Sequence, residues 1–394
     1  MTLNRLLVID DEADLAAFVA ETANDMGFEA SAFTDAAKFR RMVESCQPTV
    51  LVLDLQMPQV DGIELLRWLG DVGCDAHVLI VSGMDTRVVT TAEQLGLSLG
   101  LKMAGAMTKP IALDSLEIRL GQLKISERKI TADALAAAIE AGQLVVHYQP
   151  KVVSKGPGRW IVEGAEALVR WKHEEYGLLY PDSFLPLAEE SGLITNLTDF
   201  VFRAAMEQAR VWFANGLYME LAVNVSAQFL TDLEFPDRLL NLVNENNLDP
   251  SMLTLELTET TSIADPEVTM DILARLRVRN VKLCIDDFGT GFSSLTHLYQ
   301  MPFNELKIDN SFIRDMQTNE DARAMVEALI YLAHKLKISV CAEGVENEHT
   351  LNMLEQMHCD AAQGYLIGDG VNAKQLEQLV ENWNSRFRTE AVAS

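Results

Sequence analysis

Val281-Lys282-Leu283-Cys284-Ile285 is an apolar run that leads directly into Asp286-Asp287-Phe288-Gly289-Thr290-Gly291. The run predicts a buried β-strand, and the two glycines predict the loop after it. Two adjacent carboxylates at the end of a strand are costly unless a cation lies between them. An isolated pair of this kind is usually a solvated turn with a helix N-cap, so the interpretation depends on how the other strands of the chain end.

The same pattern recurs along the rest of the chain after Gln143, where apolar runs alternate for the most part with helical patterns. Seven further strands are predicted at Leu144–Tyr148, Ile161–Val169, Leu221–Val225, Leu253–Leu257, Glu305–Ile308, Ser339–Ala342 and Ala361–Leu366. Eight strands in about 250 residues are typical of a (β/α)₈ barrel, whose active site lies at the C-terminal ends of the strands.

Polar side chains cluster at these predicted strand ends. They are Gln149, Glu166, Arg170, Asn224, Glu256, Glu259, Asp286, Asp287, Lys307, Asp309, Glu343, Glu346 and Gln363. Each alone is an ordinary exposed strand end, but their recurrence at all eight strands indicates a site. Oxygen-rich carboxylate sites suit Mg²⁺ or Mn²⁺, and a shared carboxylate can bridge two such ions for phosphoryl chemistry.

Composition restricts the class of protein. The 394 residues are enough for two or three domains, and 32 Lys and Arg against 58 Asp and Glu give a net charge of −26. Such an acidic chain repels nucleic acid, and it would repel an anionic substrate unless metal ions or local basic groups reverse the field. The five cysteines form no CxxC pair and no run approaches 18 apolar residues, so we expect a soluble, cytoplasmic protein without membrane insertion.

The first 120 residues follow a different pattern, in which short strands alternate with amphipathic helices. The clearest strands are Leu6–Ile9, Val50–Leu53, Val78–Val81 and Gly105–Met107. This alternation predicts a doubly wound parallel sheet with its site at the strand C-termini. The polar residues at those ends are Asp10, Asp11, Asp54, Ser82 and Lys109. Three carboxylates suit one Mg²⁺, with Asp54 available as an oxygen nucleophile.

These residues, in this order, resemble a flavodoxin-like response-regulator receiver domain over Leu3–Leu123. The resemblance implies phosphorylation of Asp54 by a sensor histidine kinase, with Mg²⁺ held by Asp10, Asp11 and Asp54. Ser82 and Lys109 would read the phosphoryl group. Receivers usually carry an aromatic switch residue three positions before the lysine, where this chain has Ala106, which has no ring for the usual aromatic readout.

The domain boundary is expected in a polar stretch. We place the receiver at residues 1–123, a semi-rigid linker at 124–132 and the second domain at 133–394. Thr131 followed by Asp133 predicts the start of a helix at this boundary.

The second domain resembles the EAL family of cyclic di-GMP phosphodiesterases. The motifs that carry the resemblance are Tyr148-Gln149-Pro150-Lys151, Glu166-Ala167-Leu168-Val169-Arg170-Trp171, Asn224-Val225-Ser226, Glu256-Leu257-Thr258-Glu259, Asp286-Asp287-Phe288-Gly289, Lys307-Ile308-Asp309, Glu343-Gly344-Val345-Glu346 and Gln363-Gly364-Tyr365. The resemblance implies a TIM-like barrel whose first strand is antiparallel to the others. It also implies hydrolysis of cyclic di-GMP to linear pGpG and a homodimer or higher homo-oligomer.

The resemblance also implies a role for each motif residue. One Mg²⁺ or Mn²⁺ ion would be bound by Glu166, Asn224, Glu256 and Asp286, and a second by Asp286, Asp287 and Glu343. Lys307 would act as a base or orient the attacking water, together with Glu343 and Gln363. The substrate contacts would be Gln149, Leu168 and Arg170. Glu259 would stabilise the Asp286–Thr296 loop.

One departure from the family pattern leaves the chemistry in place. Where the family has an aromatic, a small residue, a basic residue and proline, this chain reads Ile367-Gly368-Asp369-Gly370. We expect altered substrate affinity rather than loss of reaction. Two other functions stay open: a catalytically inactive cyclic di-GMP receptor, and an interaction module. Formation of pGpG on incubation with cyclic di-GMP and Mg²⁺ or Mn²⁺ separates the enzyme from both.

Overall fold

The computed structural model describes residues 4–57, 60–84, 86–123, 130–258, 265–289 and 295–387. The chain divides into two compact units, Met1–Lys129 and Ile130–Ser394, which we describe separately. Most of the predicted linker, residues 124–129, lies outside the described ranges.

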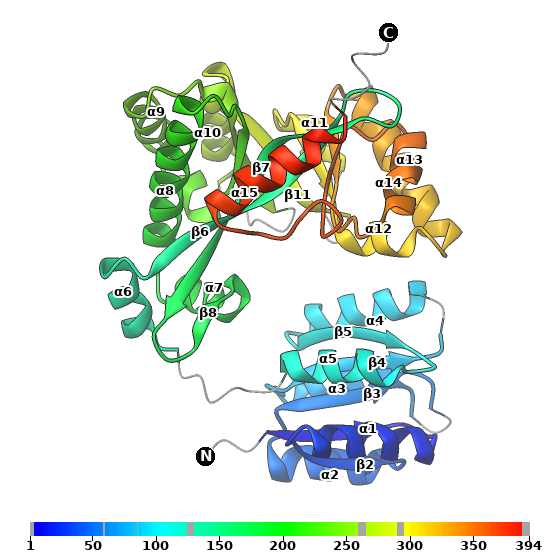
Figure 1. The fold of residues 1–394 in the computed structure, drawn as a ribbon. Coiled ribbons are helices and arrows are strands. Elements are labelled where there is room, and N and C mark those ends of the chain that lie inside the picture. Colours follow the sequence, from blue (N-terminus) through cyan, green and yellow to red (C-terminus); the bar gives the residue numbers. More distant parts are fainter. Residues whose placement is uncertain are drawn as a thin grey trace. The chain divides into compact units, whose positions relative to one another are not determined.

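The first unit is a five-stranded parallel sheet in the order β2-β1-β3-β4-β5. Its strands are Arg5–Ile9 (β1), Glu29–Phe33 (β2), Val50–Asp54 (β3), His77–Ser82 (β4) and Lys102–Thr108 (β5). Its helices are Ala13–Asp25 (α1), Ala36–Cys46 (α2), Gly62–Asp71 (α3), Thr86–Ser98 (α4) and Leu113–Leu123 (α5). Figure 1 shows these elements in blue to cyan.

Both faces of this sheet are buried, because successive side chains on a strand point to opposite faces. Leu7 and Ile9 belong to the core shared with α2, α3 and α4, whereas Leu6 and Val8 belong to the core shared with α1 and α5. The predicted doubly wound fold is therefore confirmed, and the carboxyl ends of its strands meet at one edge.

The second unit is a closed barrel of eight strands. The sheet order is β6-β14-β13-β12-β11-β10-β9-β7-β8, and an additional β6–β7 pairing closes it. Strand β6 is antiparallel to β7 and β14, whereas the pairs from β7 through β9 to β14 are parallel. The predicted TIM-like barrel with an antiparallel first strand is confirmed, and the short β8 extends one edge as a hairpin with β7.

The barrel strands are Leu144–Ser154 (β6), Trp160–His173 (β7), Gly177–Leu179 (β8), Glu220–Asn224 (β9), Leu253–Thr258 (β10), Lys282–Phe288 (β11), Glu305–Ile308 (β12), Ser339–Ala342 (β13) and Ala361–Gln363 (β14). The α-helices are Ala132–Glu140 (α6), Leu185–Glu190 (α7), Ile194–Ala214 (α8), Phe235–Glu245 (α9), Pro266–Val278 (α10), Leu295–Gln300 (α11), Asn310–Asp315 (α12), Glu320–Lys335 (α13), Glu348–Gln356 (α14) and Ala373–Ser385 (α15). The predicted helix start is confirmed, since the Thr131 hydroxyl accepts a hydrogen bond from the Ala134 amide.

Strand β14 is shorter than the predicted Ala361–Leu366 because the backbone turns at Gly364. Its φ is +154°, and a Cβ there would lie 2.2 Å from the Val345 nitrogen, so only glycine fits this close approach. The turn places Gln363 at the last position of the strand.

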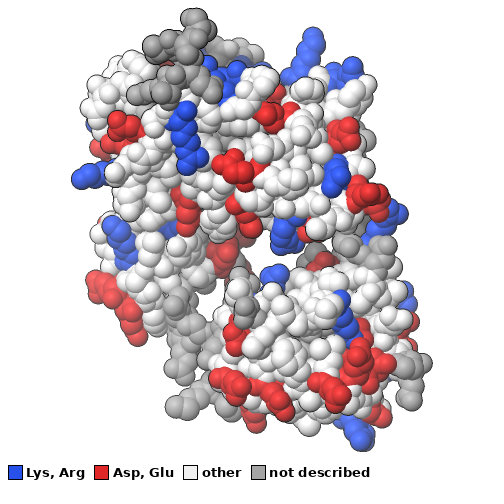
Figure 2. All heavy atoms as spheres, turned by 45° about the vertical axis from the view of Figure 1, so that its right-hand side comes forward, with Lys and Arg blue, Asp and Glu red and all other residues white. Residues whose placement is uncertain are grey.

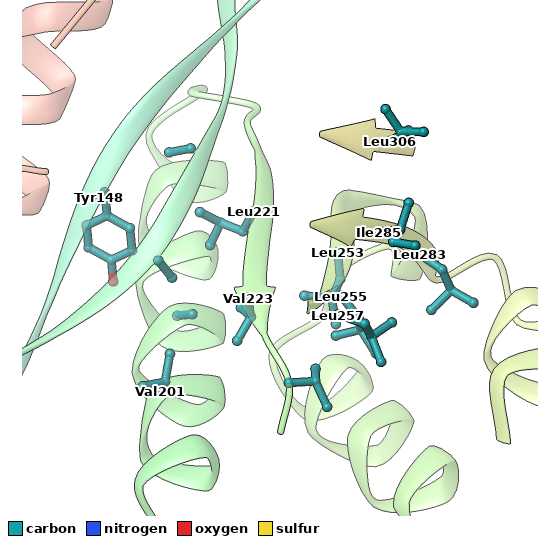
Figure 3. Packing of buried hydrophobic residues seen from close by; sticks show 14 of the residues in the cluster. Tyr148, Val201, Leu221, Val223, Leu253, Leu255, Leu257, Leu283, Ile285 and Leu306 are labelled. Carbon is teal, nitrogen blue, oxygen red and sulfur yellow. The ribbon is translucent and has the colours of Figure 1, made fainter. Parts of the chain in front are cut away.

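The apolar residues of the barrel strands pack outward against the helices. Figure 3 shows Leu221 and Val223 of β9 beside helix α8, which carries Val201. The alternate positions, such as Thr254 and Glu256 of β10, are buried but polar. Whereas many barrels of this type fill their interior with branched apolar side chains, this interior holds charged groups.

One end of the interior, remote from the candidate site, is closed by a charged network. The Lys151 ammonium lies 3.0 Å from a Glu305 oxygen and 3.4 Å from a Glu220 oxygen. Glu220 also accepts a hydrogen bond from the Thr254 hydroxyl and forms an ion pair with Lys282. Because β6 runs opposite to its neighbours, its C-terminal half delivers Lys151 to the end where the parallel strands begin.

Candidate active site

At the opposite end of the barrel, Lys307 lies inside a ring of carboxylates. Its ammonium nitrogen is 3.2 Å from oxygens of Glu166, Glu256 and Asp286 and 2.7 Å from an oxygen of Glu343. The lysine is only 1% exposed. A buried ammonium is tolerated only when anions surround it. Here the anions come from β7, β10 and β11 and from the residue directly after β13.

Glu166 is the most extensively hydrogen-bonded of these carboxylates. One oxygen accepts from the Asn224 amide at 2.7 Å, and the other accepts from the Gln363 amide at 2.8 Å and from Lys307. Gln363 also donates to the Gln149 side-chain oxygen at 3.0 Å. The structure therefore brings the predicted residues of β6, β7, β9 and β14 into one hydrogen-bond network.

The two adjacent aspartates reach the same site because β11 contains a bulge. Consecutive side chains of a regular strand point to opposite faces. Between Ile285 and Phe288 the pairing with β12 shifts by one residue, and Asp287 has a left-handed φ of +54°. Carboxylate oxygens of Asp286, Asp287 and Glu343 consequently lie within 4.8 Å of one another, a spacing that suits a shared metal ion.

Glu343 is held at the site by a tight turn directly after β13. The next residue, Gly344, has a φ of +67°, and a Cβ at that position would lie 2.7 Å from the Asn310 Cβ. A side chain would be strained there on both counts, so glycine permits the chain to leave the barrel immediately after the carboxylate.

Burial and mutual repulsion raise the carboxylate pKa values, whereas Lys307 and hydrogen-bond donors lower them. Burial raises the pKa of Glu343 to about 8, with Asp286 and Glu166 adding to the rise and Lys307 opposing it. Burial, followed by the charges of Asp286 and Asp309, raises the pKa of Asp287 to about 6. Burial alone would also raise the pKa of Glu166, but Lys307, Gln363 and Asn224 together lower it.

These shifts predict that both the stability of the barrel and the metal affinity of the site depend on pH. A raised carboxyl pKa means that the folded protein holds a proton that the unfolded chain releases. Binding of this proton stabilises the fold at low pH, and the stabilisation is lost as pH rises from the ordinary carboxyl pKa to about 8. In chelator, the unfolding temperature of the barrel should therefore fall as pH rises over this interval. Metal affinity should rise roughly tenfold per pH unit, because a ligating carboxylate must lose its proton.

Thermal unfolding and calorimetric Mn²⁺ titrations across this pH interval test the prediction. Glu343→Gln is the control variant, because it removes the group with the higher pKa and should flatten the dependence. An apparent metal affinity that is independent of pH in the unaltered protein would contradict it.

The predicted substrate-contacting residues line a rim beside the ring of carboxylates. The buried Arg170 guanidinium stacks 4.7 Å from the centre of the exposed Tyr180 ring and donates to the Val169 carbonyl, while its Nε has no partner among the described residues. Arg170 and Leu168 both lie beside Gly370. The sequence analysis did not identify Tyr180, because it directly follows the short strand β8, which was not predicted.

The segment that departs from the family pattern forms part of this rim. The Gln149 amide donates to the Gly368 carbonyl at 3.3 Å, and the His147 ring nitrogen Nδ1 lies 3.0 Å from the Gly370 carbonyl. His147 also escaped the sequence analysis, although it shares a strand face with Gln149 and Lys151 at a spacing of two residues.

Two of the acidic strand-end residues, Asp309 and Glu346, are not part of the cluster. Asp309 caps helix α12 by accepting from the Ser311 amide, and Glu346 is exposed. Glu259 and residues 290–294 of the predicted loop lie outside the described ranges, so the role predicted for Glu259 stays a prediction.

The first unit holds a second acidic site at the carboxyl edge of its sheet. Asp10, Asp11 and Asp54 bring carboxylate oxygens within 4.8 Å of one another. The Lys109 ammonium lies 2.9 Å from oxygens of Asp10 and Asp54, and the Ser82 hydroxyl accepts from the Met84 amide. Burial raises the pKa of Asp10, whereas the two aspartates raise that of Lys109 against the effect of burial.

Surface charge agrees with the acidic composition. On the face in Figure 2, Asp and Glu are interspersed with Lys and Arg, and the described residues form no continuous basic patch there. None of the described helices combines the length and apolar character needed to cross a membrane.

Comparison with known proteins matches each unit to a domain family. The EAL domain family matches residues 132–369, and the response regulator receiver domain matches residues 6–120. This chain belongs to the EAL domain family. Its EAL domain is preceded by a receiver domain, and that combination agrees with both sequence resemblances.

Relatives named for their enzymatic activities share this EAL domain. The chain is 41% identical over 244 residues to the bifunctional diguanylate cyclase/cyclic di-GMP phosphodiesterase MucR of Pseudomonas aeruginosa, covering 61% of this chain and 35% of that protein. It is 32% identical over 338 residues to the cyclic di-GMP phosphodiesterase RocR of the same organism, covering 83% and 85%. A solved PaMucR phosphodiesterase in complex with c-di-GMP is 41% identical, with a TM-score of 0.58 and coverage of 62% and 98%.

Proposed function

We propose that the EAL domain hydrolyses one phosphodiester bond of cyclic di-GMP to give linear pGpG, and that phosphorylation of Asp54 in the receiver regulates this reaction. The observation that carries the proposal is the convergence of Glu166, Glu256, Asp286 and Glu343 on Lys307 at one end of the barrel. RocR, which the chain matches over most of both lengths, is named a cyclic di-GMP phosphodiesterase.

The donor set fits two divalent ions. With Asp287, the cluster has five carboxylates and one ammonium, so its formal charge is −4, which two Mg²⁺ or Mn²⁺ ions would balance. Glu166, Asn224, Glu256 and Asp286 would hold one ion, and Asp286, Asp287 and Glu343 the other. Oxygen ligands of this kind suit both metals. When bound, the ions acidify the attacking water and offset phosphate charge.

The remaining residues position the reactants. Gln149 and Gln363, which hydrogen-bond each other, would orient the substrate and the water. Lys307 would orient that water, or accept its proton if the two bound cations lower the lysine pKa enough for the ammonium to have lost its own proton first. Arg170 would bind a phosphate oxygen, and Leu168 would contact the substrate beside it. A guanidinium whose Nε–H has no partner among the described residues suits that role.

In the receiver, Asp54 would accept the phosphoryl group from a sensor histidine kinase. Asp10, Asp11 and Asp54 would hold one Mg²⁺, and Ser82 and Lys109 would bind the added phosphoryl oxygens. The proposed division is residues 1–123 for the receiver, 124–132 for the linker and 133–394 for the EAL domain, in a homodimer or higher homo-oligomer.

Chromatography of the products tests the barrel's activity. Incubation with cyclic di-GMP and Mg²⁺ or Mn²⁺ should yield linear pGpG, and a chelator should stop the reaction. If cyclic di-GMP binds tightly but no product forms at any concentration of either metal, the domain is a receptor and not an enzyme. If cyclic di-GMP neither binds nor is hydrolysed, an interaction module is the remaining function.

A further inference from the structure

The ammonium group of Lys307 lies among the carboxylates that would bind the metal ions. Its salt bridges join Glu166 and Glu256, two ligands proposed for one ion, to Glu343, a ligand proposed for the other. Asp286, the proposed bridging ligand, is a fourth partner. The lysine thus lies at the centre of the ligand set, and its charge acts on both proposed positions at once.

Without metal ions, this arrangement has an electrostatic problem. Glu256 is 1% exposed and Asp286 is 7% exposed, so water screens their mutual repulsion poorly. Taking a charge out of water without a partner is strongly destabilising. Protonation of some of these carboxylates relieves part of the repulsion, and a cation among them relieves the rest before the metals bind.

We propose that Lys307 is the built-in counter-ion that keeps this end of the barrel folded and its ligands gathered when the metal ions are absent. The inference rests on the proposed function, because it takes these carboxylates as metal ligands. It assigns Lys307 a structural task in the metal-free protein in addition to its proposed task in hydrolysis. Two divalent ions would take over this task, because they supply more positive charge at the same place.

Lys151 provides a matched control within the same barrel. It is also buried, at 4% exposure, and it is also paired with glutamates, Glu220 and Glu305. Its network lies at the other end of the interior, and neither glutamate belongs to the group of carboxylates that could share a metal. Methionine at either position keeps an unbranched side chain of similar length while removing the charge.

The test compares unfolding temperatures of the full-length unaltered protein, Lys307→Met and Lys151→Met, each in EDTA and in saturating Mn²⁺. Tryptophan fluorescence follows the barrel, because four of the five tryptophans, Trp160, Trp171, Trp212 and Trp383, belong to it. In EDTA, both variants should unfold roughly 10 °C below the unaltered protein, since each loses one partner of a buried ion pair. In Mn²⁺, Lys307→Met should recover to within about 3 °C, whereas Lys151→Met should keep its whole deficit.

A second variant covers the case in which metal-free Lys307→Met does not fold. Lys307→Met/Glu343→Gln removes one negative charge together with the positive one. In EDTA it should unfold at a higher temperature than Lys307→Met, or fold where the single variant does not.

Two results would overturn the inference. If Mn²⁺ stabilises the unaltered protein but the deficit of Lys307→Met is the same in EDTA and Mn²⁺, the inference fails and the proposed function stands. If Mn²⁺ changes neither the unfolding temperature nor the calorimetric signal of the unaltered protein, the proposed metal-dependent function fails and the inference fails with it.

Discussion

Asp286→Asn is expected to lower the turnover number for cyclic di-GMP by about 10³-fold, equivalent to ~4 kcal/mol of transition-state stabilisation. The substitution keeps the size of the side chain and removes its charge. Asp286 is the residue that both proposed metal positions share, and one of its oxygens contacts Lys307 at 3.2 Å. Loss of this carboxylate should therefore weaken both metal positions together.

Release of linear pGpG measures the effect, and Mn²⁺ titration calorimetry measures how many ions bind. Asp271→Asn is the matched control, because Asp271 is an exposed residue of helix α10. That variant should keep the turnover of the unaltered protein. Full activity with two bound ions in Asp286→Asn would exclude the proposed bridging role.

Asp54→Asn is expected to abolish phosphorylation of the receiver by a small phosphodonor such as acetyl phosphate. The reaction needs a carboxylate oxygen as nucleophile, and an asparagine amide does not provide one. Asp54 is 2% exposed, and one of its oxygens lies 2.9 Å from Lys109, which would stabilise the added negative charge. Intact-protein mass spectrometry detects the added group.

Asp61→Asn separates this loss from damage to the fold. Asp61 caps helix α3 by accepting from the Glu64 amide at 2.7 Å, and asparagine caps helices equally well. This variant should be phosphorylated normally. Any change in pGpG formation caused by acetyl phosphate or beryllofluoride should occur in the unaltered protein and be missing in Asp54→Asn. If the Asp54→Asn variant is still phosphorylated, a residue other than Asp54 accepts the phosphoryl group.

The sequence predicts both folds because most strands of each repeat one signal, although β2 and β8 lack it and were not predicted. Apolar runs that end in polar residues mark the strands, and their number and spacing distinguish the barrel from the doubly wound sheet. The local start of helix α6 at Thr131 could be predicted for the same reason, since a cap is a property of neighbouring residues.

Features that depend on non-local geometry could not be predicted in this way. The bulge at Asp286 and Asp287 exists only in relation to the pairing with β12. The partners of Lys151 follow from the reversed direction of β6, which the residues alone do not specify. The Arg170–Tyr180 stacking joins a strand to a later turn, and no periodicity links the two residues.

The reversed first strand has a consequence for the order in which the barrel folds. Strands β6 and β7 pair over a short connection between Ser154 and Trp160, so their contacts are close in sequence and can form early. Pairing of Val152 with Ala362 joins residues more than 200 positions apart and closes the barrel only after most of the chain is in place. We expect a chain truncated before β14 to keep the hairpin but leave an open β-edge on β6, which would favour aggregation over a smaller stable domain.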